Sequence, residues 1–242
     1  MSWTAAPSVP VLREHELHVW RAGTAASVDA LRAAEAVLAA DERDRADLFR
    51  HAPSRTAYVV ARAAFRRIVG AYLDVDPASV RFAYSAWGKP CLADPDGGAR
   101  LQFNLSHSGE WAVYAFAIDR PVGVDVEQIR QMPDLMDIAR CFFAASEYEA
   151  LSRLEGAGRL ESFFACWTRK EAYLKARGPG LSASMSEFVV SVSASEPPRL
   201  LADHESSGEV GRWAFRTVDV GPGYAGAVVV EGEPDRVRFF DI

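Results

Sequence analysis

Residues 101–129 read "LQFNLSHSGEWAVYAFAIDRPVGVDVEQI", and they decide the fold because they predict three consecutive strands. Each apolar run is short and ends at a turn residue, which is typical of strands rather than helices. Gly109 ends the first run, and Pro121 precedes the third. We place the boundary between two halves of the chain at Arg120-Pro121, so that the third strand opens the second half.

The region before these strands predicts one strand followed by helices. The strand covers 16–22, where apolar and polar residues alternate. Ser27 is the predicted N-cap of a helical stretch that breaks once, and Ser54 is the predicted N-cap of the long helix that follows. Apolar positions at three- and four-residue steps in the long helix are expected to face the core, namely Tyr58, Ala61, Phe65, Ile68 and Tyr72.

The region after these strands again predicts helices and then strands. Ser146 and Glu149 are predicted to form a capping box, and Gly178 is predicted to end a helix over about 160–176. Three strands are expected to follow, at 188–194, 212–220 and 224–232. The order strand, helices, strands therefore appears twice, although no repeat is visible residue by residue.

This order predicts an α+β protein with two similar halves, residues 1–119 and 120–242. Each half is expected to be a small antiparallel sheet packed with helices, and an active site is expected in the cleft between them. Because one chain supplies both sides of that cleft, we expect a monomer.

Composition excludes several classes of function. The net charge of −6 argues against general binding to nucleic acid or to anionic membranes, which requires a basic surface. No apolar run approaches the ~20 residues of a membrane span, and the start lacks the basic-then-apolar pattern of a secretion signal. We therefore expect a cytoplasmic protein and interpret its scattered cysteines, Cys91, Cys141 and Cys166, as reduced core thiols.

Two acidic residues stand two positions apart in the strand "GVDVE". Residues two apart share a face of a strand, so Asp125 and Glu127 would present paired carboxylates while Val124 and Val126 face the core. Such carboxylates repel each other unless a cation lies between them or one takes a proton. Mg²⁺ suits these oxygen ligands, and an ordinary solvated strand face is the alternative.

Lysine is rare in this chain, since only three of its 27 Lys+Arg residues are lysines. Two of them flank Glu171 in "WTRKEAYLKARGPGL" (167–181), where Glu171 and Lys175 are four residues apart on one helical face. An exposed helix pair worth ~0.3–0.5 kcal/mol is one interpretation. Proton transfer is the other, because an ammonium can release a proton and a guanidinium does not.

Two further segments carry residues suited to phosphate. Ser106, His107 and Ser108 end the strand "FNLSHS", where the hydroxyls and the imidazole could bind phosphate oxygens or could only satisfy the turn. Lys89 and Pro90 belong to the turn "WGKP", in which a solvated lysine would be unremarkable by itself.

The order of these segments resembles the signature series of the 4'-phosphopantetheinyl transferases. The length is similar to that of the Sfp-type (surfactin-synthetase-activating) branch, whose members resemble two fused copies of the short fatty-acid-synthase type. The resemblance runs from about residue 40 to 230. It rests on five segments in order, "WGKP", "FNLSHS", "GVDVE", "FFAASEYEAL" and "WTRKEAYLKARGPGL".

The resemblance implies transfer of the phosphopantetheine arm of coenzyme A to a serine of a carrier protein, with release of adenosine 3',5'-bisphosphate. The Mg²⁺ ligands that it implies are Asp125, Glu127 and Glu171. Glu171 would also be the base for the serine hydroxyl, and Lys175 would protonate the departing bisphosphate. The implied contacts to coenzyme A come from Arg45, Arg55, Lys89, Pro90, Ser106 and His107.

Some points stay open at this stage. Pro179 stands where the family often has a basic residue between two glycines, and the role of Lys170 is undecided. A surface near Arg140, Phe142 and Phe143 is a candidate for docking the carrier protein. The resemblance does not say whether peptide, polyketide or fatty-acid synthases supply that carrier.

Two rival functions use the same residues differently. A metal-dependent phosphoesterase would activate water with these carboxylates, but the sequence lacks the His-rich or closely spaced Asp clusters of a two-metal site. A non-enzymatic module that only binds carrier proteins would have no need for Asp125, Glu127 and Glu171 together.

Overall fold

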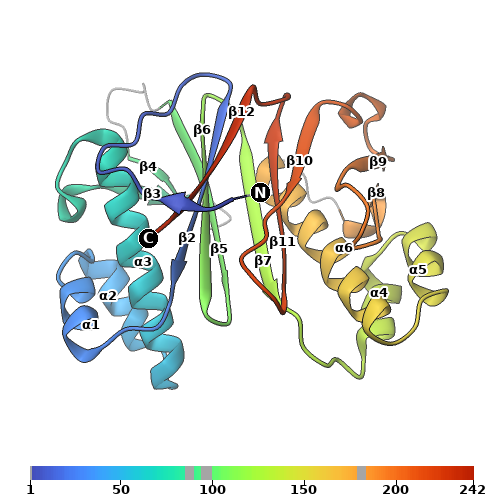
Figure 1. The fold of residues 1–242 in the computed structure, drawn as a ribbon, viewed down its shortest axis with the longest axis horizontal. Coiled ribbons are helices and arrows are strands. Elements are labelled where there is room, and N and C mark those ends of the chain that lie inside the picture. The colour runs from blue at the N-terminus through green and yellow to red at the C-terminus, as the bar shows by residue number, and fades with distance from the viewer. Residues whose placement is uncertain (1, 85–89, 94–99, 179–183) are drawn as a thin grey trace.

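The structure is a computed structural model that describes residues 2–84, 90–93, 100–178 and 184–242. Two sheets stand at the centre, and each carries helices on its outer side, as Figure 1 shows. The predicted α+β class is confirmed.

The first sheet has five strands and combines both ends of the chain. Its order is β1 (Thr4–Ala5), β12 (Arg236–Asp241), β2 (Glu16–Gly23), β6 (Trp111–Ile118) and β5 (Leu101–Ser108). The pairs β1–β12 and β12–β2 are parallel, and the remaining pairs are antiparallel. The sheet is therefore mixed rather than antiparallel, because the last strand of the chain returns to pair with β2 (Figure 1).

The second sheet is antiparallel. Its order is β10 (Trp213–Thr217), β11 (Tyr224–Glu231) and β7 (Val122–Gln128). Two short hairpins complete the strands, β3 (Phe82–Tyr84) with β4 (Pro90–Leu92), and β8 (Phe188–Val190) with β9 (Leu200–Asp203).

Helices cover the outer side of each sheet (Figure 1). Beside the first sheet lie α1 (Val28–Glu35), α2 (Ala40–Asp47) and α3 (Ala52–Leu73). Beside the second lie α4 (Leu135–Phe142), α5 (Ala145–Ser152) and α6 (Gly156–Arg177). Short 3₁₀ turns occur at η1 (Pro77–Ser79), η2 (Met185–Glu187) and η3 (Ser207–Glu209).

The two sheets pack against each other through β7. Val124 and Val126 are fully buried against Val19 of β2 and Val113 of β6, which confirms that these valines face the core. The opposite face of the second sheet packs on α6, and the outer face of the first sheet packs on α3. The molecule thus has four layers, helix, sheet, sheet and helix.

Of the predicted helix starts, the one at Ser27 was correct. The hydroxyl of Ser27 accepts a hydrogen bond from the amide of Ala30 at 3.2 Å, which confirms it as the N-cap of α1. The prediction for Ser54 was wrong, because α3 already begins at Ala52. Pro53 fits that first turn, where no amide donor is required.

The predicted capping box of α5 was also wrong. The helix begins at Ala145, and the carboxylate of Glu147, rather than Glu149, accepts a hydrogen bond from the amide of Ala144 at 2.9 Å. Glu147 is fully buried and pairs with Lys170 of α6, so a long-range contact fixes this helix start. No capping pattern in the local sequence reports such a contact.

The cysteines are free but only one is a core residue. Cys166 of α6 is buried, whereas Cys91 and Cys141 are exposed, so the prediction of core thiols was wrong for these two. Cys91 lies in the two-stranded hairpin β3–β4, and Cys141 lies on an exposed face of α4. No helix in the described ranges is both long and apolar enough to cross a membrane.

Candidate active site between two strands and a helix

Polar side chains join β5 to β7, although these two strands belong to different sheets. The side-chain oxygen of Asn104 accepts a hydrogen bond from the amide of Val124 at 3.0 Å. Two residues further along β5, the hydroxyl of Ser106 donates to Oδ1 of Asp125 at 2.7 Å. Side chains therefore align the two strands where no backbone ladder joins them.

The same alternation continues to the end of β5. The hydroxyl of Ser108 donates to Oε2 of Glu127 at 2.8 Å and accepts from the amide of Gln128 at 3.1 Å. Both carboxylates of the "GVDVE" segment are thus oriented by serines of the "FNLSHS" segment.

Helix α6 approaches β7 at Gly123. A β-carbon at this position would stand 2.1 Å from the carbonyl oxygen of Ala172 and 2.4 Å from the amide nitrogen of Ala176. Real β-carbons do not come so close to backbone atoms, so glycine is required here. This close approach brings Glu171 and Lys175 of the helix next to the strand's carboxylates.

Lys175 connects the helix to the strand. Its ammonium nitrogen lies 2.6 Å from Oδ1 of Asp125, and it also donates to the Ser106 hydroxyl and the Val124 carbonyl, each at 3.4 Å. Asp125 is almost fully buried while Lys175 is partly exposed. The ammonium, the serine hydroxyl and the carboxylate therefore meet at one point.

The negative charges of the two strand carboxylates act on Glu171. Burial raises the pKa of Glu171, and the negative charges of Asp125 and Glu127 raise it further, while Lys175 opposes them. Burial and Asp125 likewise raise the pKa of Glu127, against the Ser108 hydrogen bond. Three carboxylates from two distant segments, Asp125, Glu127 and Glu171, thus influence one another electrostatically, and their predicted role as ligands of one cation stays a prediction.

Carboxylate oxygens such as these are the ligand type that a hard divalent cation prefers. Oδ2 of Asp125 is buried and has no hydrogen-bond partner among the described residues, so this oxygen is open to a ligand. The described part of the chain nevertheless contains no group of three His, Cys, Asp or Glu side chains gathered closely enough to hold a metal. Lys175 bonds the other oxygen of Asp125, Oδ1. The carboxylates therefore do not form a ready-made cation site, and they would have to close around a cation as it binds.

The remaining predicted residues of the site differ in their surroundings. His107 follows Ser106 on β5 and is exposed. Pro90 is half-buried at the start of β4 and pairs with Tyr84. Lys89 and Pro179 lie outside the described residues.

Arg55 and Arg45 lie among the first three helices. Arg55 of α3 forms ion pairs with Glu35 of α1 at 2.6 Å and with Asp47 of α2 at 3.1 Å. Arg45 of α2 is exposed. The structure therefore gives Arg55 a role in joining these helices, and its predicted contact to a nucleotide stays a prediction.

Lys170 does not belong to the site. Its ammonium is fully buried, lies 2.7 Å from Glu147, and donates to the carbonyls of Met185 at 2.7 Å and Phe188 at 2.6 Å. The question that the sequence left open is answered here, because this lysine anchors α6 to the segment before β8.

The candidate docking residues separate in a similar way. Arg140 and Phe142 are exposed on α4, whereas Phe143 is buried in the core of the second half. The prediction that Phe143 belongs to a docking surface was therefore wrong.

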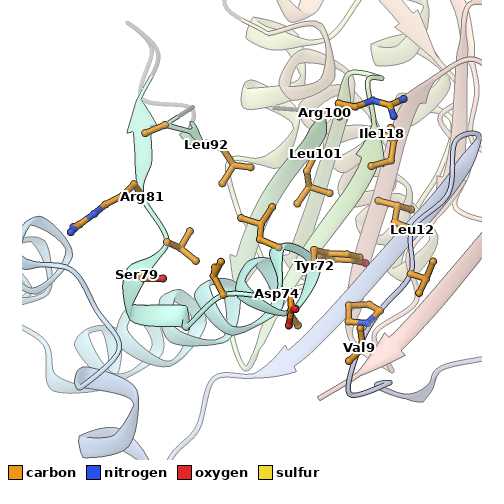
Figure 2. A pocket seen from close by; sticks show the side chains of 17 residues that line it. Val9, Leu12, Tyr72, Asp74, Ser79, Arg81, Leu92, Arg100, Leu101 and Ile118 are labelled. Atoms are coloured by element: carbon orange, nitrogen blue, oxygen red, sulfur yellow. The ribbon is translucent and has the colours of Figure 1, made fainter. Parts of the chain in front are cut away.

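A cavity of about 990 Å³ lies elsewhere, between the end of α3, the β3–β4 hairpin and the N-terminal segment. Figure 2 shows its largely apolar wall, with Leu12, Tyr72, Leu101 and Ile118. None of the predicted site residues lines it.

The sequence analysis assigned no role to Asn104 or Gly123, and it did not predict the bond from Ser108 to Glu127. The signal for Asn104 and Ser108 was present, since Asn104, Ser106 and Ser108 alternate on one face of a strand. Gly123 carried the weaker signal of a glycine inside a strand, which often marks close backbone approach.

Two family models match this chain. A model of the 4'-phosphopantetheinyl transferase superfamily matches residues 121–229, and a model of the N-terminal region of a 4'-phosphopantetheinyl transferase matches residues 22–118. The first covers β7 and α6, and the second covers β5.

Individual relatives match most of the chain. The 4'-phosphopantetheinyl transferase HetI of Nostoc sp. is 37% identical over 199 residues, which cover 82% of this chain and 84% of HetI. The 4'-phosphopantetheinyl transferase Sfp of Bacillus subtilis is 30% identical over 193 residues, which cover 78% of this chain and 80% of Sfp. A solved holo-acyl-carrier-protein synthase of Thermotoga maritima superposes on 47% of this chain and 63% of its own, with 24% identity and a TM-score of 0.38.

Proposed function

This chain belongs to the 4'-phosphopantetheinyl transferase superfamily, and from that premise we propose that it transfers the phosphopantetheine arm of coenzyme A to a carrier-protein serine. Adenosine 3',5'-bisphosphate leaves in this reaction, and Mg²⁺ is required. The acceptors are carrier domains of fatty-acid, polyketide or nonribosomal peptide synthases. Because one chain supplies β5, β7 and α6, the proposed enzyme acts as a monomer, and the cytoplasm is its proposed location.

One observation carries the proposal. Lys175 of α6 lies 2.6 Å from Asp125 of β7, and the Ser106 hydroxyl of β5 shares the same carboxylate oxygen. Three segments that resemble the family's motifs thus meet through side-chain contacts. In this proposal Lys175 is the acid and Asp125 the cation-binding carboxylate, and their closeness suits phosphoryl transfer, because its catalysis consists mainly of positioning and charge neutralisation.

The chain's own groups would move two protons. The serine oxygen of the carrier attacks the phosphorus that bears the pantetheine arm, and its proton passes to Glu171, directly or through water. The bond from that phosphorus to the bisphosphate oxygen breaks, and Lys175 gives its proton to this departing oxygen.

Asp125, Glu127 and Glu171 would hold Mg²⁺, with the buried Oδ2 of Asp125 as one ligand atom. When bound, Mg²⁺ polarises a phosphoryl oxygen and stabilises the charge that develops on the leaving side. Ser106 keeps the other oxygen of Asp125 bonded, so that the carboxylate retains one orientation.

Contacts to the nucleotide and its phosphates would come from the first half. The residues proposed for them are Arg45, Arg55, Lys89, Pro90, Ser106 and His107. Arg55 would have to exchange its bonds to Glu35 and Asp47 for bonds to the ligand.

The test is incubation with coenzyme A, Mg²⁺ and an apo carrier domain, followed by mass spectrometry. A carrier mass increased by one phosphopantetheine supports the proposal, and no increase without Mg²⁺ supports the cation. Hydrolysis of coenzyme A without carrier modification would instead identify a phosphoesterase.

A further inference from the structure

Ser108 makes two hydrogen bonds that fix the direction of its hydroxyl. The amide of Gln128 can only donate, and it occupies a lone pair of the hydroxyl at 3.1 Å. The one hydroxyl proton is directed to Oε2 of Glu127 at 2.8 Å. A serine with both bonds made has no other rotor position that satisfies them, so it presents a fixed donor to the carboxylate.

The position of Ser108 is itself fixed by the hairpin that follows it. Gly109 turns with a φ of +56°, and a β-carbon there would stand 2.5 Å from the Tyr224 hydroxyl. That hydroxyl also accepts the amide hydrogen bond of Glu110 at 3.0 Å. The Tyr224 hydroxyl of β11 thus holds the end of β5, although β7 stands between β11 and the first sheet.

Glu127 has no comparable support from the main chain across this junction. Strands β5 and β7 lie in different sheets, so no backbone ladder between them sets where the Glu127 side chain lies. Ser106 orients Asp125 in the same way, but Lys175 also bonds that carboxylate. For Glu127, Ser108 is the hydrogen-bond donor that the described residues supply.

We propose that Ser108 is a positioning residue that holds Glu127 in the orientation needed to bind the divalent cation. The inference rests on the proposed function, since Glu127 is a cation ligand only there. It adds a residue that touches neither substrate nor cation, and that acts through the carboxylate it bonds. Partners that orient a metal ligand in this way typically contribute 10–100-fold to metal affinity or activity.

The experiment compares Ser108→Thr with Ser108→Val. The side chains of threonine and valine have nearly the same shape and both suit a strand, but only threonine keeps the hydroxyl. Mn²⁺ is the probe, and its binding to each protein with coenzyme A is followed by the loss of the free-ion paramagnetic resonance signal. Thermal unfolding of each variant confirms that it is folded, and Ser108→Ala replaces Ser108→Val if the valine variant is not.

The inference predicts that Ser108→Val binds Mn²⁺ about 10-fold more weakly than wild type, whereas Ser108→Thr retains most of the affinity. In the carrier assay, the Mg²⁺ concentration for half-maximal rate should rise in Ser108→Val more than the rate at saturating Mg²⁺ falls. Equal Mn²⁺ affinity in the wild-type, Val and Thr proteins would overturn the inference, as would a wild type that binds no Mn²⁺.

The two proposals fail separately. If wild type modifies no carrier but Ser108→Val still binds Mn²⁺ more weakly than Ser108→Thr, the reaction is wrong and the positioning role stands. If wild type modifies carriers and the variants do not differ, only the positioning role is lost.

Discussion

Gly123 of β7 lies so close to Ala172 of α6 that a β-carbon on the glycine would stand 2.1 Å from the alanine's carbonyl oxygen. The obstacle is backbone, so it cannot move aside as the end of a flexible side chain could. This contact sets the separation of the two segments that carry the site, and with it the 2.6 Å distance between Lys175 and Asp125.

Gly123→Ala should therefore harm both stability and catalysis. The added methyl group forces α6 away from β7, and overpacking of this kind costs about 1–3 kcal/mol of unfolding free energy. Turnover should fall further than the loss of folded protein explains, because Lys175 moves away from Asp125. Urea unfolding and the carrier assay measure the two effects.

Gly158→Ala is the matched control on the same helix. A β-carbon at Gly158 meets nothing within 4 Å, so the change should leave α6 in place. Because alanine favours a helix over glycine, stability should rise by up to about 1 kcal/mol. Equal effects of the two alanine substitutions would show that the close approach does not matter.

Glu171→Gln should lower the rate of carrier modification by at least ~10²-fold while the fold stays intact, since the amide cannot accept a proton. Glu161→Gln is the control, because Glu161 is an exposed acid on the same helix. Circular dichroism checks the fold of both variants. A Glu171→Gln enzyme with normal turnover would remove this residue from the chemistry.

Lys175→Arg separates charge from proton transfer. Arginine keeps the positive charge beside Asp125 but does not release a proton, so coenzyme A should bind nearly as well while turnover drops. Calorimetry measures the binding, and single-turnover kinetics measure the transfer. Equal rates for arginine and lysine would dismiss the proton-donor role.

Lys170→Met should unfold the protein more easily without a specific effect on catalysis. Removing this lysine leaves Glu147 buried without its counter-ion, and breaking such a pair typically costs about 3–5 kcal/mol. The double variant Lys170→Met, Glu147→Gln should recover part of that loss. If the double variant is less stable than wild type by the sum of the two single losses, the pair is not coupled.

The buried His18 is expected to make the fold sensitive to acid. Burial lowers the pKa of His18 to about 4, with Arg238 acting in the same direction and Glu16 opposing. The ring also bonds the Tyr72 hydroxyl at 2.7 Å. Because the unfolded chain binds a proton at higher pH than the folded one, stability should fall as the pH drops from about 6.5 towards 4, by on the order of 3 kcal/mol.

The measurement is the unfolding free energy in urea across this pH range. His18→Gln should flatten the profile, since it removes the titrating ring. A variant with the same slope as wild type would assign the acid sensitivity to another group.

The sequence predicted what depends on local pattern. Alternation in 122–128 located β7 and the faces of Asp125 and Val124, and the spacing of Glu171 and Lys175 placed both on one side of α6. It failed where long-range contacts decide. Strand β12 pairs with β2 across more than two hundred residues, and the buried Lys170–Glu147 pair fixes a helix start that capping patterns misplace.

The site followed the same division. Residue types and order in the segments identified the carboxylates and lysine. The roles of Asn104, Ser108 and Gly123 depend on β5 and α6 lying against β7, which periodicity along one strand does not report.

The most direct test is a crystal structure of the protein with coenzyme A and Mg²⁺. The account predicts Mg²⁺ at about 2.1 Å from Oδ2 of Asp125 and from oxygens of Glu127, Glu171 and the pyrophosphate. Coenzyme A bound away from β7 and α6, with Asp125 holding no cation, would contradict it.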